Sequence, residues 1–381
     1  MSVEYIIAES QIPAIVFFKD NDMKIKLFAA AAAALVSAGA SAQSSVTLYG
    51  VADAGIEWAN KVPGTNGGGN SRVSMQSGNG MTGSLWGLRG VEDLGGGLKG
   101  IFNLESGFDI SRGTSNDSRL FGRKAYVGLQ GQWGQLTLGR QTNLMYDFTT
   151  QYDPMALTSR YSILSQDAAM GGRADNAVKY VGTFNGLTAS ALYSFRNDGQ
   201  EIAGNSKVGR EWSAGLNYAA GPFSVGAVYD QTNGNSPLTA DIKVQRATAA
   251  GTYAFGPAKL FAGYRWGHVT GLPIAAETRS NLYWLGAGYQ ATPALSLTGA
   301  AYYQNHKSDV GNPWLFSVGA DYALSKRTDA YLNLAYAKNS SNALLPIGVA
   351  QDTTPAVVVN PDGTTSSSNP MGAMVGIRHK F

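Results

Sequence analysis

Polar and apolar residues alternate with a period of two along most of the chain beyond residue 43. In the stretch 46–58, Val46, Leu48 and Trp58 share one parity, whereas Asp53 and Glu57 share the other. Successive side chains of a β-strand point to opposite faces, so this alternation is typical of a strand with one apolar and one polar face. The same pattern recurs in residues 187–196, 223–230, 246–255, 295–304, 329–336 and 371–381. The chain is therefore predicted to be all-β.

The segments between these runs come in two lengths. Short segments lie at 94–98, 131–135, 184–187, 219–223, 255–259, 291–295 and 325–329. Longer, polar segments lie at 61–82, 109–118, 142–175, 197–209, 231–243, 267–278, 305–312 and 341–369. Seven short turns and eight long loops connect sixteen predicted strands.

Two architectures fit an all-β chain of short strands: a soluble sandwich or propeller, and a transmembrane barrel. Short turns at one end and long loops at the other favour the barrel, as does an apolar face on every strand with no strand apolar on both faces. Aromatic residues near strand ends, such as Trp58, Tyr229 and Tyr336, are typical of girdles at the lipid headgroups. The sequence therefore predicts a 16-stranded antiparallel transmembrane β-barrel with short periplasmic turns and long extracellular loops.

The final strand supports a closed sheet. Residues 371–381 alternate up to Phe381, with Val375 and Ile377 on one face and Met374 and Arg378 on the other. A sheet in a bilayer must close because every backbone N–H and C=O group needs a partner. We therefore expect the last strand to pair with the first, with Phe381 as part of the wall.

Composition argues against ordinary soluble domains. Charged residues make up 14% of the 381 residues, below the roughly 25% of a typical globular chain. The mean hydropathy of -0.12 is too low for a bundle of membrane helices and too high for a disordered chain. The absence of cysteine excludes disulfides, thiolate metal sites and cysteine nucleophiles.

Residues 23–42 have the three parts of a secretory signal peptide. Lys24 and Lys26 form the basic part, residues 27–36 the apolar part, and residues 40–42 (Ala-Ser-Ala) the cleavage site. The apolar run is shorter than the roughly 20 residues that span a membrane, which disfavours an anchor. Residues 43–381 form the predicted barrel, which starts at Gln43. We interpret residues 1–22 as an extension from a start codon assigned too early, because they place the signal internally.

Five stretches of the chain resemble the Gram-negative general porins, the trimeric sixteen-stranded barrels, and the β-proteobacterial branch in particular. They are "SSVTLYGVADAGIEW" (44–58), "GLRGVEDLGGGLKGIFNLE" (87–105), "GRKAYVGLQGQWGQLTLGRQ" (122–141), "GADYALSKRTDAYLNLAYAKN" (319–339) and "GAMVGIRHKF" (372–381). Together they span essentially the whole predicted barrel in order.

The resemblance implies an outer-membrane homotrimer surrounded by outer-membrane lipid. It implies a water-filled channel through which small hydrophilic solutes and ions diffuse passively, with no cofactor and no nucleic-acid partner. A terminal Phe381 on an alternating strand resembles the signal that the outer-membrane assembly machinery recognises. An outer-membrane barrel enzyme and an adhesin are the alternative functions.

No motif in the chain favours an enzyme. "GGGLKG" at 95–100 matches a phosphate-binding pattern, but an alternating strand follows it where a helix is needed, so a glycine turn is the better interpretation. His268, His306 and His379 are far apart and lack metal-ligand spacing. No compact Ser/His/Asp motif is present. We therefore predict neither a catalytic nor a metal site.

Basic residues recur on the polar faces of the predicted strands. A charge inside a membrane barrel is acceptable where it lines water. The positions on the polar parity are Arg89, Arg123, Lys179, Arg196, Arg246, Lys259, Arg265 and Arg378. The simplest interpretation is that most of them solvate a channel wall.

The resemblance distinguishes a few of these residues, because basic side chains stack on the porin wall at its narrowest point. "FGRKAYVGL" puts Arg123 in that ladder, and "GGRADNAVKY" puts Arg173 at another rung. The family often has S-R-L-G-L-R-G at the first rung, whereas "SLWGLRG" puts Leu85 there. This departure predicts a pore that is only moderately anion-selective.

The long loop 142–175 supplies the other side of the predicted constriction. A loop of this length in a compact protein is usually functional, and in porins the third loop folds into the barrel, with its carboxylates facing the basic wall. The loop carboxylates predicted to face the lumen are Asp147 and Asp153. The predicted constriction comprises Arg89, Arg123, Arg173, Lys179, Leu85, Asp147 and Asp153.

Overall fold

The structure is a computed structural model. It describes residues 45–63, 69–78, 80–272, 278–307, 311–339, 358–359, 365–366 and 369–381. Residues 44–381 belong to one compact unit. The predicted extension (1–22) and signal peptide (23–42) lie outside the described residues.

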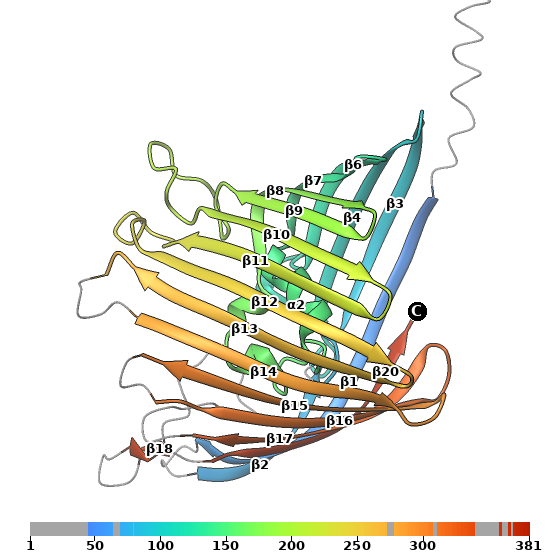
Figure 1. Ribbon diagram of the computed structural model, residues 1–381, viewed down its shortest axis with the longest axis vertical. Coiled ribbons are helices and arrows are strands. Elements are labelled where there is room, and N and C mark those ends of the chain that lie inside the picture. Colours follow the sequence, from blue (N-terminus) through green and yellow to red (C-terminus); the bar gives the residue numbers. More distant parts are fainter. Residues whose placement is uncertain are drawn as a thin grey trace, which may run out of the picture. The chain divides into compact units, whose positions relative to one another are not determined.

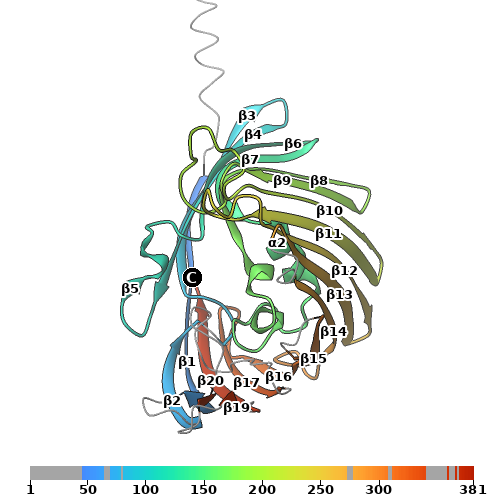
Figure 2. The ribbon, with the colours of Figure 1, turned by 90° about the vertical axis from the view of Figure 1, so that its left-hand side faces the viewer.

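A ring of sixteen antiparallel strands forms a closed barrel, as predicted (Figures 1 and 2). Each strand pairs with the next in the chain, and the last pairs with the first. The wall strands are β1 (Ser45–Pro63), β3 (Leu85–Gly95), β4 (Leu98–Asp109), β6 (Lys124–Gly131), β7 (Gly134–Thr142), β8 (Arg173–Phe184), β9 (Leu187–Ser194), β10 (Glu211–Ala220), β11 (Phe223–Asn233), β12 (Lys243–Phe255), β13 (Ala258–Thr270), β14 (Thr278–Gln290), β15 (Leu295–His306), β16 (Trp314–Ala323), β17 (Thr328–Lys338) and β20 (Met371–Lys380).

The remaining elements lie in the long connections. They are β2 (Gly69–Ser77), β5 (Thr114–Ser115), β18 (Val358–Val359), β19 (Thr365–Ser366), helix α2 (Leu144–Tyr152) and the 3-10 turns η1 (Asn116–Ser118), η2 (Ile163–Ser165) and η3 (Ala168–Gly171).

Strand β2 corrects one prediction, because residues 61–82 were expected to be a polar loop. The segment pairs with β1 from Ala54↔Ser77 onward. Val73 and Met75 alternate with polar residues and are exposed on the outer face, so the segment follows the same strand pattern as the wall. The polar residues around it concealed this short alternation.

The barrel closes at the last strand. β20 pairs with β1 in a register that runs from Val51↔Lys380 to Ala59↔Gly372. Beyond it, the backbone N–H groups of Gly50 and Phe381 each donate to the other residue's carbonyl oxygen at 3.0 Å. The C-terminus therefore lies beside β1, as Figure 2 shows, and the prediction that the last strand pairs with the first is confirmed.

The outer face is apolar, as a lipid-facing wall requires. Exposed aliphatic side chains include Val46, Leu48, Val127, Leu216, Leu285 and Val375. Aromatic side chains pair across neighbouring strands, as Tyr303 and Trp314 do at a ring-centroid distance of 4.5 Å. Among the described residues, no helix has the length and apolar character needed to cross a membrane.

The third long loop (143–172), which contains α2, lies within the ring (Figure 2). Its side chains Met145, Tyr152 and Tyr161 are buried and pack in one cluster with Trp284 and Tyr302 of the wall. The apolar core therefore lies between this loop and the inner face of the wall. The polar side of the loop is left facing the rest of the lumen.

Candidate functional site

Helix α2 positions the loop side chains that face the lumen. The Asn143 side chain caps the helix by accepting from the Tyr146 backbone N–H at 2.9 Å. Asp147 lies in the first turn, where the helix dipole favours a negative charge. Leu144 and Phe148 are buried on the opposite side. The helix therefore presents Tyr146 and Asp147 on its lumenal side.

A buried ion-pair cluster anchors the far end of the loop to the wall. Asp167 accepts from Arg246 Nε at 3.0 Å and lies 3.1 Å from Arg265 Nη2. Burial acts to raise the pKa of Asp167, but the two guanidinium groups outweigh it and hold the pKa below its ordinary value. The carboxylate is therefore ionised at neutral pH, and the two arginines are tied to the loop.

Two further anchors attach the loop elsewhere on the wall. Glu57 of β1 accepts from Arg160 Nη1 at 2.9 Å and from the Tyr161 hydroxyl at 2.6 Å. Asp153 accepts from the Tyr302 hydroxyl at 2.5 Å and from the Leu157 backbone N–H at 2.7 Å. The loop is thereby fixed on β1, β13 and β15 as well as on the strands next to it.

An upper cavity, at the end of the lumen nearer the long loops, lies between loop 3, residues 81–83 and the segment 109–123 that precedes β6. Its volume is about 650 Å³. Four arginines line it, whereas Asp109 is the one carboxylate among its described lining residues. The arginines are Arg112, Arg123, Arg160 and Arg173. Asp109, Glu105 and Glu57 form ion pairs with Arg112, Arg123 and Arg160, so the excess of positive charge in this part of the lumen rests on Arg173.

Arg123 and Arg173 are held differently. Arg123 Nε donates to Glu105 Oε1 at 2.7 Å, while Lys124 Nζ lies 3.2 Å from Glu105 Oε2. Two cations therefore share one carboxylate. The Arg173 guanidinium lies 5.4 Å from the centre of the Tyr146 ring, and none of the described carboxylates lies within 4.0 Å of it. Arg173 is thus a cation held by the aromatic ring of loop 3.

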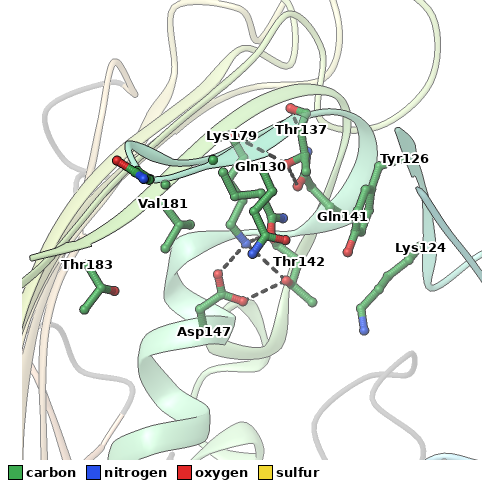
Figure 3. Close-up of a pocket in the computed structure, with 14 residues that line it drawn as sticks. Lys124, Tyr126, Gln130, Thr137, Gln141, Thr142, Asp147, Lys179, Val181 and Thr183 are labelled. Atoms are coloured by element: carbon green, nitrogen blue, oxygen red, sulfur yellow. Dashed lines mark hydrogen bonds and ion pairs between the residues drawn. The ribbon is translucent and has the colours of Figure 1, made fainter. Parts of the chain in front are cut away.

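A lower cavity of about 420 Å³ continues along β6, β7 and β8 (Figure 3). Lys124 and Tyr126 lie on one side of it, and Lys179 and Asp147 on the other. Lys179 Nζ donates to the Thr142 carbonyl oxygen at 2.9 Å and forms an ion pair with Asp147. The loop helix therefore contributes one partly exposed carboxylate that opposes Lys124 across the cavity.

The structure places four of the predicted constriction residues on these two cavities. Arg123 and Arg173 line the upper cavity, and Asp147 and Lys179 line the lower one. Arg89 faces inward over the Tyr49 ring, one step nearer the short-turn end of the barrel than the Glu105 level, and lines neither cavity.

Two residues that the sequence predicts at the constriction, Asp153 and Leu85, lie elsewhere in the structure. Asp153 is only 3% exposed, because its carboxyl is used to anchor the loop on Tyr302, and burial raises its pKa to about 6. It does not face the lumen. Leu85 is 6% exposed and lines neither cavity, so it is not an empty rung of the basic ladder.

The other inward basic residues are mostly used to hold the structure together. Arg246 and Arg265 bind Asp167 of the loop, and Arg378 Nε donates to Asp329 at 2.9 Å. Arg196 lies just beyond β9, where it donates to loop carbonyls. Arg246, Arg265 and Arg378 therefore anchor the loop and the strands, and the interpretation that they merely solvate a channel wall is wrong.

Sequence reasoning missed three residues that shape the cavities: Lys124, Arg160 and Tyr146. The alternation in "RKAYVGL" signals Lys124, because it shares the inward parity of Tyr126 on β6. No periodic signal marks Arg160 or Tyr146, since both belong to an irregular loop whose contacts depend on the wall.

The closed barrel, its apolar exterior and its narrowed, charged lumen define a transmembrane channel of the porin class. The profile of the Gram-negative porin family matches residues 29–342, and the chain belongs to this family. It is an outer-membrane porin, a channel for passive diffusion. The family consists of channels rather than enzymes.

Two relatives align with this chain over nearly their whole length. An outer membrane porin protein of Bordetella pertussis is 34% identical over 366 residues, covering 83% of this chain and 95% of the relative. Outer membrane porin protein 32 of Delftia acidovorans is 32% identical over 371 residues, covering 94% of this chain and 100% of the relative.

Solved structures show the same fold. The anion-selective porin from Comamonas acidovorans superposes with a TM-score of 0.77 at 29% identity, covering 89% of this chain and 100% of that one. The OmpT outer membrane protein of Vibrio cholerae has a TM-score of 0.63 at 14% identity, covering 90% and 100%, and supports the fold alone.

Proposed function

We propose that this porin conducts small hydrophilic solutes and ions with a moderate preference for anions. The observation that carries the proposal is the upper cavity, where Arg123 and Arg173 face a lining with a single described carboxylate. The similarity to a structure described as an anion-selective porin supports it. Asp147 in the lower cavity opposes the preference and keeps it moderate.

The size of the effect follows from Coulomb's law. A unit charge roughly 6 Å from a passing ion contributes ~0.7 kcal/mol in bulk water and more in a confined pore. Salt screens this interaction over a Debye length of about 10 Å at 0.1 M. The preference is therefore expected to be largest at low ionic strength.

Planar-bilayer recordings of the native protein in a KCl gradient test the proposal. The zero-current potential is expected to have the sign of chloride preference, and the preference is expected to decline as the salt concentration of both chambers rises. A potential of the opposite sign, or one that salt leaves unchanged, contradicts the proposal.

We further propose that the channel is a homotrimer in contact with outer-membrane lipid. A trimer form is described for Vibrio cholerae OmpT, which shares the fold at a TM-score of 0.62. Light scattering of the detergent-extracted protein is expected to give three times the chain mass after correction for detergent.

Phe381 is proposed to act as an assembly signal as well as a wall residue. Its backbone closes the ring with Gly50, and its side chain is half exposed on the outside. Deletion of Phe381 is expected to lower the yield of folded barrel in cells, measured as the band that shifts on boiling. The matched control is Phe381→Tyr, which keeps the aromatic ring. An unchanged yield in the deletion variant contradicts the assembly role.

The predicted processing site gives another test. Signal peptidase is expected to cut after Ala42, because residues 40–42 have the small side chains that it requires. Edman sequencing of outer-membrane material is expected to start at Gln43. A start before Met23 contradicts both the cleavage site and the proposed start codon.

A further inference from the structure

Like loop 3, the connection between β2 and β3 lies against the inner face of the barrel wall. β2 pairs with β1 beyond residue 54, and β3 pairs with β1 before residue 51, so the chain between them bridges an interruption in the second wall strand. Residues 80–84 are the described part of this bridge that leads into β3. Their contacts are with the inward faces of β1, β17 and β20.

Three strand side chains bond to this segment, and a fourth, Tyr331, supports one of them. Asp53 Oδ2 accepts from the Thr82 backbone N–H at 2.8 Å, and Asp53 Oδ1 accepts from the Tyr331 hydroxyl at 2.6 Å. Asn333 Nδ2 donates to the Gly80 carbonyl oxygen at 2.6 Å. Arg378 Nη1 lies 3.3 Å from Thr82 Oγ1.

Burial makes this attachment firm. Asp53 is completely buried, and Asn333 is 1% exposed. A buried hydrogen bond to a charged group is stronger than an exposed one. A buried polar group that loses its hydrogen-bond partner lowers the stability of the fold. The segment is therefore a fixed part of the lumen, in contrast to a surface loop that moves away from the pore.

The segment also forms one side of the upper cavity. Met81, Thr82 and Gly83 line it together with Arg123 and Arg173. A Cβ atom added at Gly83 meets only Arg123 Nη1, at 3.2 Å. Gly83 is thus the point where the backbone of the segment comes next to the arginine that borders the pore.

We propose that the segment 80–84 is a second inward constriction element, and that Gly83 sets the free width of the pore beside Arg123. Loop 3 closes the lumen from one side, and this segment narrows what remains from the other. The absence of a side chain at Gly83 leaves the passage next to Arg123 open. Any group added there projects into the upper cavity. This inference concerns pore width and does not depend on the ion preference proposed above.

The chain contains no cysteine, which allows a test on the folded channel. In the Gly83→Cys variant the new thiol meets only the mobile end of Arg123, so the channel is expected to open normally. A bulky neutral methanethiosulfonate reagent is then added during a single-channel recording. Modification is expected to reduce the conductance stepwise by about twofold or more, because it fills the narrow part of the pore.

Gly288→Cys provides the matched control. Gly288 also faces the lumen, on β14, where an added Cβ has only Phe261 and Thr298 near 4 Å, and it lines neither cavity. Modification of this variant is expected to change the conductance little. The proposal is overturned if mass spectrometry shows that the thiol of the Gly83→Cys variant is modified while the conductance stays the same. It is equally overturned if that thiol does not react in the open channel, or if modification of the Gly288→Cys variant blocks as strongly.

Discussion

The Arg173→Gln substitution is expected to lower the chloride-to-potassium permeability ratio by about threefold or more at low salt, which corresponds to the ~0.7 kcal/mol of one charge at roughly 6 Å. Arg173 borders the upper cavity, and Tyr146 holds its guanidinium there. Its removal also relieves repulsion from Arg123, so the fold is expected to persist. Arg123→Gln is expected to act in the same direction.

Glu105→Gln supplies a comparison of opposite sign. The amide keeps the shape of the carboxyl group but removes the negative charge that Arg123 and Lys124 share. The permeability ratio is therefore expected to rise. Arg279→Gln, on the exposed outer side of β14, is the matched control and is expected to leave the ratio unchanged. If Arg173→Gln and Arg279→Gln give equal zero-current potentials, Arg173 does not act on the ion path.

The Asp167→Asn substitution is expected to release the end of loop 3 from the wall. It removes the ion-pair partner of Arg265 and leaves Arg246 with only the weaker attraction of Asp230 and Glu211, and breaking a buried pair costs ~3–5 kcal/mol. We expect the folded band on gels to be lost at a lower temperature. We also expect a larger, noisier single-channel current, because the loop no longer holds one position in the lumen.

The native pH dependence follows from the same anchor. The pKa of Asp167 is held below its ordinary value, so the anchor is present above the ordinary Asp pKa and is lost as pH falls through the lowered one. Asp241→Asn, which removes an exposed ion pair with Lys207, is the control. It is expected to change neither the thermal stability nor the single-channel current. A quiet channel of native conductance and native thermal stability in Asp167→Asn contradicts the anchoring role.

The wall could be predicted from sequence because its determinants are local. The alternation at 46–58 and 371–381 already indicates which side chains face lipid and which face the lumen. The same alternation of outward and inward side chains is found in the other wall strands. Short turns follow from the same pattern, since they are what remains between two runs. The closing contact of Phe381 with Gly50 follows from the need to pair every backbone group.

The lumen could be predicted only in part, because its side chains are placed by partners far along the chain. The sequence gives no reason to treat Asp153 and Asp147 differently. In the structure Asp153 is buried and accepts a hydrogen bond from Tyr302, whereas Asp147 forms an ion pair with Lys179 beside the lower cavity. Leu85 occupies an arginine position of the family pattern but is covered. The segment 80–84 carries no periodic signal, since side chains from three wall strands fix it.

Anions are expected to pass beside Arg123 and Arg173 in the upper cavity. Anomalous diffraction from bromide-soaked crystals of the native protein and of the Arg173→Gln variant tests this expectation most directly. The account predicts a bromide peak next to the two guanidinium groups and the Tyr146 ring in the native protein, and its loss or marked weakening in the variant. Bromide bound elsewhere in the lumen with none at this position, or a peak of equal height in both proteins, contradicts the account.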